Sequence, residues 1–157
     1  MKDNNQIQVN STNKIDNQEV QLKSSKEFEI RFSEVDAMRI VWHGAYAHYF
    51  EDAREQFGDD YGLSYWDFFQ NGYYVPLVDL RFSYKKPLQF RQKARIDITY
   101  RNVPAAKIIF DYEIRLLSDD SLIATGTSTQ VFLDANYQLI WSNPPFYEDW
   151  KKKHNLL

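Results

Sequence analysis

The chain has 157 residues, of which 43% are hydrophobic and 17% aromatic, so it suits one domain with a real core and excludes disorder over most of its length. A formal net charge of -3 argues against nucleic acid and acidic membranes as partners, and the lack of cysteine excludes disulfides, thiolate catalysis and cysteine-ligated zinc. No apolar run approaches the ~20 residues of a membrane span and no signal-peptide core is present, so we expect a cytoplasmic protein.

Polar and charged side chains dominate residues 1–25, which we expect to form a flexible or loosely docked tail. A single domain is then expected over residues 26–157. Its first strand is predicted where apolar and charged side chains alternate, the apolar ones being Phe28, Ile30 and Phe32.

A long amphipathic helix is predicted from about Gly44. Its apolar side chains recur at spacings of three and four: Tyr46, Tyr49, Phe50, Ala53, Phe57 and Tyr61. Gly58 and Gly62 are candidate ends of this helix. Ser64 and Asp67 have the spacing of a capping box for a short second helix.

Beyond this helix the apolar period changes to two, which is typical of strands with one buried face. Four strands are predicted, within residues 78–84, 95–100, 108–116 and 121–134. Their short connections favour antiparallel neighbours, and Pro144-Pro145 predicts the start of a C-terminal helix. A sheet with one apolar face and a helix with one apolar stripe can cover each other, so we expect an α+β fold.

The segment between the first strand and the long helix carries the candidate chemistry. It contains D-A-x-x-I-V-W-H-x-x-Y-x-x-x-F-E-x-A-R, which begins at Asp36, and a later strand reads VPLVDLRFSYKKPLQF. Together these blocks resemble the hotdog-fold acyl-CoA thioesterases, and more narrowly the 4-hydroxybenzoyl-CoA thioesterase group and its Tol-Pal-associated relatives. The resemblance covers roughly residues 27–135.

The resemblance implies a hotdog fold, in which an antiparallel sheet wraps around one long central helix. It also implies that Asp36 acts as nucleophile or general base, that the helix N-terminus polarises the thioester carbonyl, and that the site forms at a dimer interface. We therefore expect a homodimer or a dimer of dimers that uses a CoA thioester as substrate and needs no cofactor. Ala45 stands where the family often has Asn, which leaves the acyl specificity open.

The start of the helix supports this interpretation on physical grounds. No Ser, Thr, Asp or Asn caps it, and uncapped helix-start N–H groups together carry about half a unit of positive charge. The backbone amides of Gly44, Ala45 and Tyr46 could therefore hold the oxyanion of a thioester, and one such donor is typically worth ~10²–10³ in rate.

Each catalytic candidate also has a structural interpretation. Asp36 could simply close a turn, and His43 could pack or cap the helix instead of orienting a catalytic group. Glu51 is a reserve catalyst, although it and Arg54 have the spacing of a surface ion pair.

Basic residues near two strand ends are candidates for binding the CoA phosphates. Lys85, Lys86 and Arg91 are the principal ones, with Lys93 and Arg101 nearby in sequence. A solvated sheet edge that resists aggregation would have the same composition. Lys151-Lys152-Lys153 fits a cationic helix C-terminus.

Other classes of site lack their motifs. There is no G-x-S-x-G elbow and no P-loop, and the three histidines do not form H-E-x-x-H, so we expect no metal site. The alternatives are a non-catalytic acyl-CoA-binding protein, an acyl carrier protein thioesterase, or a hotdog hydratase or dehydratase. Asp36 and His43 are seven residues apart with neither Asn nor Pro between them, which disfavours the hydratase pattern.

Overall fold

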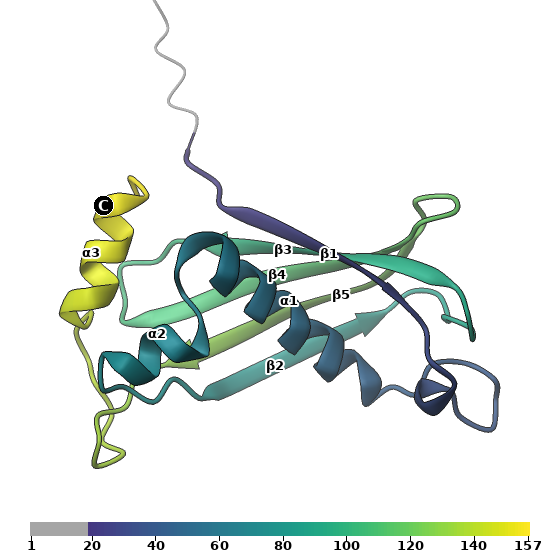
Figure 1. Ribbon diagram of the computed structural model, residues 1–157, viewed down its shortest axis with the longest axis horizontal. Coiled ribbons are helices and arrows are strands. Elements are labelled where there is room, and N and C mark those ends of the chain that lie inside the picture. The colour runs from purple at the N-terminus through teal and green to yellow at the C-terminus, as the bar shows by residue number, and fades with distance from the viewer. Residues whose placement is uncertain (1–18) are drawn as a thin grey trace, which may run out of the picture.

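The structure is a computed structural model that describes residues 19–157 (Figure 1). Its elements are β1 (Lys23–Glu29), the 3-10 turn η1 (Phe32–Glu34), α1 (Ala45–Tyr61), α2 (Tyr65–Gln70), β2 (Leu77–Tyr84), β3 (Lys93–Arg101), β4 (Lys107–Leu116), β5 (Leu122–Val131) and α3 (Pro145–Lys153). None of the helices in these residues is long and apolar enough to cross a membrane. Most of the segment expected to form a tail, residues 1–18, lies outside the described residues. β1 begins within the remainder of that segment, at Lys23.

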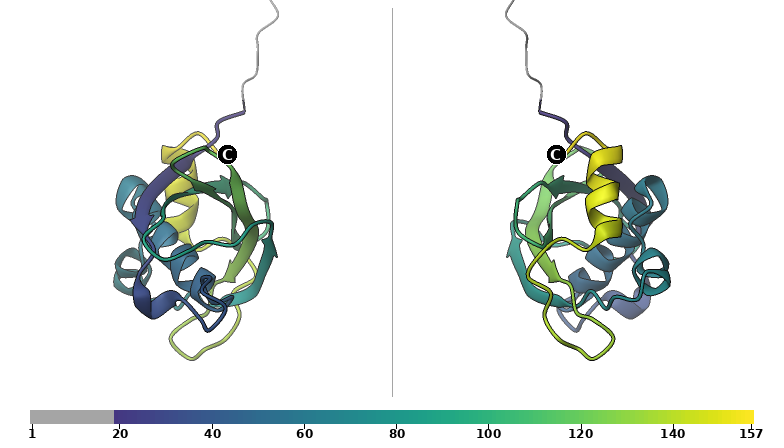
Figure 2. Two further views of the ribbon diagram at one scale, coloured as in Figure 1. Left: turned by 90° about the vertical axis from the view of Figure 1, so that its right-hand side faces the viewer. Right: turned by 90° about the vertical axis from the view of Figure 1, so that its left-hand side faces the viewer.

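The five strands form one antiparallel sheet in the order β1-β3-β4-β5-β2. Consecutive strands are neighbours from β3 to β5, as expected, but β2 pairs with β5 and not with β3. Figure 2 shows the reason: the sheet curves around α1, so a short connection can pass from β2 to β3 across one end of the molecule. Leu88 in that connection is fully buried, and its carbonyl accepts a hydrogen bond from the Val41 N–H at 2.8 Å.

The core lies between α1 and the concave face of the sheet. The predicted stripe of α1 is confirmed, with Tyr46, Tyr49, Phe50, Ala53 and Phe57 all buried. Alternate residues of β3 and β4 face it, namely Ala94, Ile96, Ile98, Tyr100, Ile108, Phe110, Tyr112 and Ile114. Each fully buried large apolar side chain contributes roughly 1.5–3 kcal/mol relative to exposure. This burial holds α1 against the sheet and thereby fixes where the helix begins.

Two predicted boundaries differ from the structure. β1 ends at Glu29, and Phe32 belongs to η1 with 79% of its surface exposed, so the apolar alternation overextended the first strand. α1 passes through Gly58 and ends at Gly62, whose φ of 75° is left-handed. Gly58 is instead required by the close approach of Ser64, since a Cβ on residue 58 would lie 2.6 Å from the Ser64 Cα. The predicted capping box of α2 between Ser64 and Asp67 is confirmed.

The C-terminal helix begins after Pro144, as predicted, and closes the end of the molecule where α1 stops (Figure 1). The Trp150 indole N–H donates to the Tyr61 carbonyl at 2.8 Å. The predicted cationic C-terminus of α3 is confirmed, since Lys151, Lys152 and Lys153 all lie in its last turn, but Lys151 does not face the solvent. Lys151 is fully buried and its ammonium donates to the Val103 carbonyl at 2.6 Å.

Candidate active site

Asp36 lies in a tight turn that connects β1 to α1. The Asp36 N–H donates to the Ile40 carbonyl at 2.9 Å, and Val35 pairs with Val41 in an antiparallel bridge. The Asp36 side chain supports the turn, since its Oδ1 accepts a hydrogen bond from the Met38 N–H at 2.8 Å. Asp36 is therefore a turn residue, as one interpretation held. The hydrogen bond that closes the turn uses only one of its two carboxylate oxygens.

A cleft of about 350 Å³ opens beside this turn. It brings together five side chains that the sequence singled out separately, namely Asp36, His43, Tyr46, Lys85 and Lys86. Apolar side chains complete its lining: Met38, Ile40, Val41, Tyr84 and Pro87. An acidic group, a helix start and two cations thus share one cleft with mainly apolar walls.

The start of α1 is uncapped, as predicted. Gly44 is its N-cap residue, and its side-chain-free position gives the first turn no side-chain cap in the part of the chain that the structure describes. The Ala45 N–H is nevertheless satisfied, because it donates to the Trp42 carbonyl at 2.9 Å. Among the described residues no acceptor pairs with the N–H groups of Gly44 and Tyr46. The set of three candidate amides therefore reduces to these two.

Two phenols, those of Tyr46 and Tyr84, share the cleft with Asp36. Asp36 is half-buried and takes part in no ion pair within residues 19–157. Burial, followed by repulsion from Tyr84, raises the pKa of the Tyr46 hydroxyl to about 12. Burial also raises the pKa of Tyr84. Both phenols are therefore neutral at physiological pH, and Asp36 is the acidic side chain available in the cleft as a base or nucleophile.

Glu34 ties the Asp36 turn to α1, a role that the sequence did not indicate. Its carboxylate accepts hydrogen bonds from the Tyr49 hydroxyl at 2.8 Å and from the Arg31 N–H at 2.9 Å, and its carbonyl accepts from the Trp42 N–H. Burial and this carboxylate raise the pKa of Tyr49, so the donor stays protonated. The turn before Asp36 and the helix after it are thus held by one side chain.

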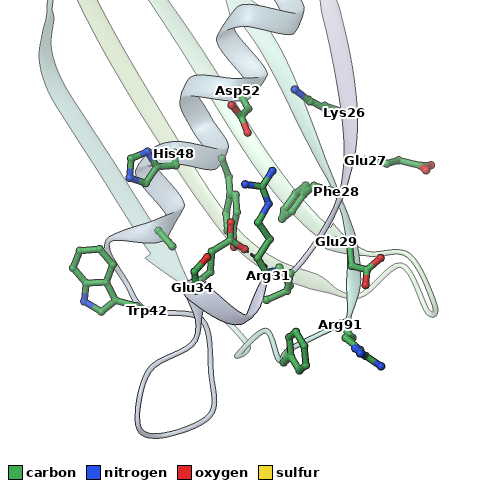
Figure 3. Close-up of a pocket in the computed structure, with 15 residues that line it drawn as sticks. Lys26, Glu27, Phe28, Glu29, Arg31, Glu34, Trp42, His48, Asp52 and Arg91 are labelled. Carbon is green, nitrogen blue, oxygen red and sulfur yellow. Dashed lines mark hydrogen bonds between the residues drawn. The ribbon is translucent and has the colours of Figure 1, made fainter.

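Arg91 does not join the cleft. It lies over the Phe90 ring at 5.2 Å and lines a second, larger groove of about 870 Å³ between β1 and α1. In Figure 3 its guanidinium is directed away from α1. His48 and Asp52 of α1 also line this groove. Lys85 and Lys86 are therefore the two phosphate candidates that adjoin Asp36.

Glu51 and Arg54 do not form the expected surface pair. Arg54 turns inward and donates to the Tyr112 hydroxyl at 3.2 Å, beneath the helix. Glu51 is exposed on α1 and lines neither the Asp36 cleft nor the larger groove. The reserve catalyst is therefore away from the groups that the cleft assembles.

The three histidines lie apart in the structure. His43 is exposed at the Asp36 cleft, His48 lines the larger groove, and His154 contacts the Tyr61 carbonyl at the other end of α1. No group of three His, Asp or Glu side chains within residues 19–157 is arranged to hold a metal ion.

Known proteins are similar to this chain in sequence and in fold. The thioesterase-like superfamily matches residues 30–152. The candidate acyl-CoA thioesterase YneP of Bacillus subtilis is 35% identical over 111 residues, which are 71% of this chain and 80% of YneP. The DHNA-CoA thioesterase from Staphylococcus aureus has a TM-score of 0.76 at 27% identity, over 85% of this chain and 89% of that one. The chloroplastic acyl-acyl carrier protein thioesterase ATL3 of Arabidopsis thaliana is 25% identical over 71% of this chain and 59% of ATL3.

The family match begins at Ile30, directly after β1, and continues through the other four strands of the sheet into α3. It therefore includes both the turn that presents the carboxylate and the helix start that faces the same cleft. The fold is the one that the resemblance implied, an antiparallel sheet wrapped around a long central helix. On this agreement of sequence and architecture, the chain belongs to the thioesterase-like superfamily.

Proposed function

We propose that this thioesterase-family enzyme hydrolyses acyl-CoA thioesters to a carboxylic acid and free CoA in the Asp36 cleft. The observation that carries the proposal is that Asp36, half-buried and without an ion-pair partner in residues 19–157, lies in one cleft with the uncapped start of α1. The name of YneP supports the CoA thioester as the substrate class. The spacing from Asp36 through His43 to Arg54 supports placement near the 4-hydroxybenzoyl-CoA thioesterase group.

The chemistry follows from the two halves of the cleft. Attack on a thioester carbonyl places negative charge on its oxygen, and the Gly44 and Tyr46 N–H groups are the donors for that oxygen. Asp36 either attacks the carbonyl carbon, giving an anhydride that water then hydrolyses, or takes a proton from the attacking water. In both routes the C–S bond breaks and the CoA thiolate leaves and is protonated. His43 lies where it can orient the substrate.

The rest of the cleft suits the rest of the substrate. Lys85 and Lys86 are exposed beside Asp36 and can bind the CoA phosphates as point charges. The apolar lining formed by Met38, Ile40 and Val41 suits an acyl group. No group other than the thioester and water is needed for this reaction.

We also propose that the enzyme is a homodimer joined through β2. This strand ends the sheet, and Leu77, Val78 and Tyr84 on it are exposed, whereas β1 at the opposite edge carries Lys and Glu side chains that discourage pairing. An antiparallel pair centred on Leu80 would place Asp79 opposite the partner's Arg81, a complementary arrangement. It would also bring the start of the partner's β2 to the end of β2 that lines the cleft.

A thiol-release assay over a panel of short aliphatic, long aliphatic and aromatic acyl-CoA esters tests the proposal. We expect Asp36→Asn to lower kcat by ~10²–10⁴, the usual contribution of a positioned acid–base group. Asp119→Asn is a matched control because Asp119 also accepts from a backbone N–H two residues on, that of Ser121 at 3.0 Å. It should retain wild-type activity.

The results separate the alternatives. Wild-type turnover by Asp36→Asn would refute the mechanism, and tight binding of acyl-CoA without thiol release by the wild type would indicate a non-catalytic binder. A matched acyl carrier protein ester in the same panel identifies the thiol carrier. Hydration of an unsaturated acyl-CoA with the thioester left intact would identify a hydratase.

A further inference from the structure

The peptide bond between His43 and Gly44 is held by two side chains, one of them distant in sequence. The Tyr84 hydroxyl, 41 residues away, donates to the His43 carbonyl at 2.9 Å. The Trp42 indole covers Gly44 so closely that a Cβ on Gly44 would meet the ring Cζ2 at 2.5 Å. The position therefore requires glycine while Trp42 keeps this orientation.

Fixing the carbonyl of this peptide also fixes its N–H. A trans peptide is planar, and its C=O and N–H point in opposite directions. With the His43 carbonyl directed at Tyr84, the Gly44 N–H points away from Tyr84, and it is one of the two candidate amides with no acceptor within residues 19–157.

Tyr84 is itself well anchored. It is the last residue of β2 and pairs with Ala124, and the N–H groups of Lys85 and Lys86 after it both donate to the Ile123 carbonyl. Its ring packs edge-to-face against Tyr46 with centroids 4.9 Å apart. The hydroxyl is thus attached to the sheet, whereas the peptide that it holds belongs to a loop.

We infer that Tyr84 is a positioning residue, which aims the Gly44 N–H at the thioester oxygen by holding the His43 carbonyl. This inference rests on the proposed thioesterase mechanism and adds to it a residue that does not touch the reacting atoms. The sheet thereby sets the direction of an oxyanion donor on a loop. A displaced donor loses part of the ~10²–10³ that an intact one supplies.

The test compares Tyr84→Phe with Tyr61→Phe. The control also removes a bond from a tyrosine hydroxyl to a backbone carbonyl, at the other end of α1, where the Tyr61 hydroxyl donates to the Lys23 carbonyl at 2.7 Å and accepts from the Lys23 N–H at 3.3 Å. Both variants should lose similar stability in thermal unfolding. With an acyl-CoA that the wild type hydrolyses, Tyr84→Phe should lower kcat about tenfold and leave KM within about twofold, while Tyr61→Phe keeps the wild-type kcat.

The pH profile of kcat/KM should keep its shape in Tyr84→Phe, because Asp36 is unaffected. A shifted profile would overturn the inference by making Tyr84 a proton donor, as would an unchanged kcat or a loss confined to KM. The Asp36→Asn variant distinguishes failure of the Tyr84 inference from failure of the proposed mechanism. An inactive Asp36→Asn together with a fully active Tyr84→Phe refutes only the role of Tyr84. Activity in Asp36→Asn refutes the mechanism itself.

Discussion

Replacement of Gly126 by alanine tests how α1 is seated on the sheet. Gly126 on β5 pairs with Phe82 of β2 on one side and with Tyr112 of β4 on the other. The Phe50 ring of α1 lies over it, parallel to the Tyr112 ring with centroids 4.0 Å apart and 4.8 Å from that of Phe82. A Cβ at Gly126 would meet Phe50 Cζ and the Arg81 carbonyl oxygen, each at 2.5 Å.

The size of the effect follows from what can move. Ordinary contact between carbon atoms is about 3.5–4.0 Å, so Phe50 would have to shift by about 1 Å or more. Phe50 is fully buried and its other neighbour here is backbone, so little relaxation is available. Overpacking typically costs 1–3 kcal/mol, and we expect about 3 kcal/mol here. In a domain of this size that lowers Tm by about 6–12 °C.

Urea and thermal unfolding followed by circular dichroism measure this change, and thiol release measures its effect on the helix start. Gly62→Ala is the control, since a Cβ at Gly62 meets nothing within 4 Å and only its φ of 75° is strained. It should cost roughly 1–2 kcal/mol and leave kcat unchanged. If Gly126→Ala unfolded within 2 °C of the wild type, α1 would not be pressed against β5 as described.

Three further predictions concern other contacts. Tyr49→Phe should lower the unfolding free energy by roughly 2 kcal/mol and reduce kcat, because it removes a 2.8 Å hydrogen bond to the Glu34 carboxylate. Urea titration measures the first change and thiol release the second. An unchanged kcat would show that Glu34 does not hold the Asp36 turn in its active position. Asp79→Arg and Arg81→Asp should each weaken the dimer and together restore it, by sedimentation analysis, whereas equal dissociation of all three variants would contradict pairing through β2. Burial lowers the pKa of Lys151 from 10.5, so the unfolded chain binds this proton more tightly than the folded one. The free energy of unfolding of the wild type relative to Lys151→Met should therefore rise as the pH approaches 10.5. A difference in unfolding free energy that stayed constant with pH would contradict the burial of this ammonium.

Local sequence was sufficient for the type and order of the main elements and for naming most of the side chains that line the Asp36 cleft. The stripe of α1 and the alternation within β3 and β4 are set by periods of 3.6 and 2, which depend only on backbone geometry. The uncapped start of α1 could be read from the residue types at its start. Asp36 was placed correctly in a turn close to this start, because it stands only nine positions before Ala45.

Contacts between distant segments decided the remaining features. The partner of β2, the inward direction of Arg54 and the burial of Lys151 depend on how the curved sheet closes around α1 and α3, which no local period encodes. The bond from Tyr84 to His43 joins positions 41 residues apart. Tyr84 continued the apolar alternation of its strand, so nothing nearby in sequence distinguished it from a packing residue.

The sequence by itself determined which groups can do chemistry, because residue type and local period fix acidity, helix starts and buried faces. Only the tertiary structure decided which of these groups lie together. Lys85 and Lys86 lie beside Asp36, whereas Arg91 lines another groove. The Ala45 N–H is hydrogen-bonded to the Trp42 carbonyl and is not available to a substrate. The physical reason is that a site requires groups to lie within a few ångströms in space, and that distance is set by packing of the whole sheet against α1.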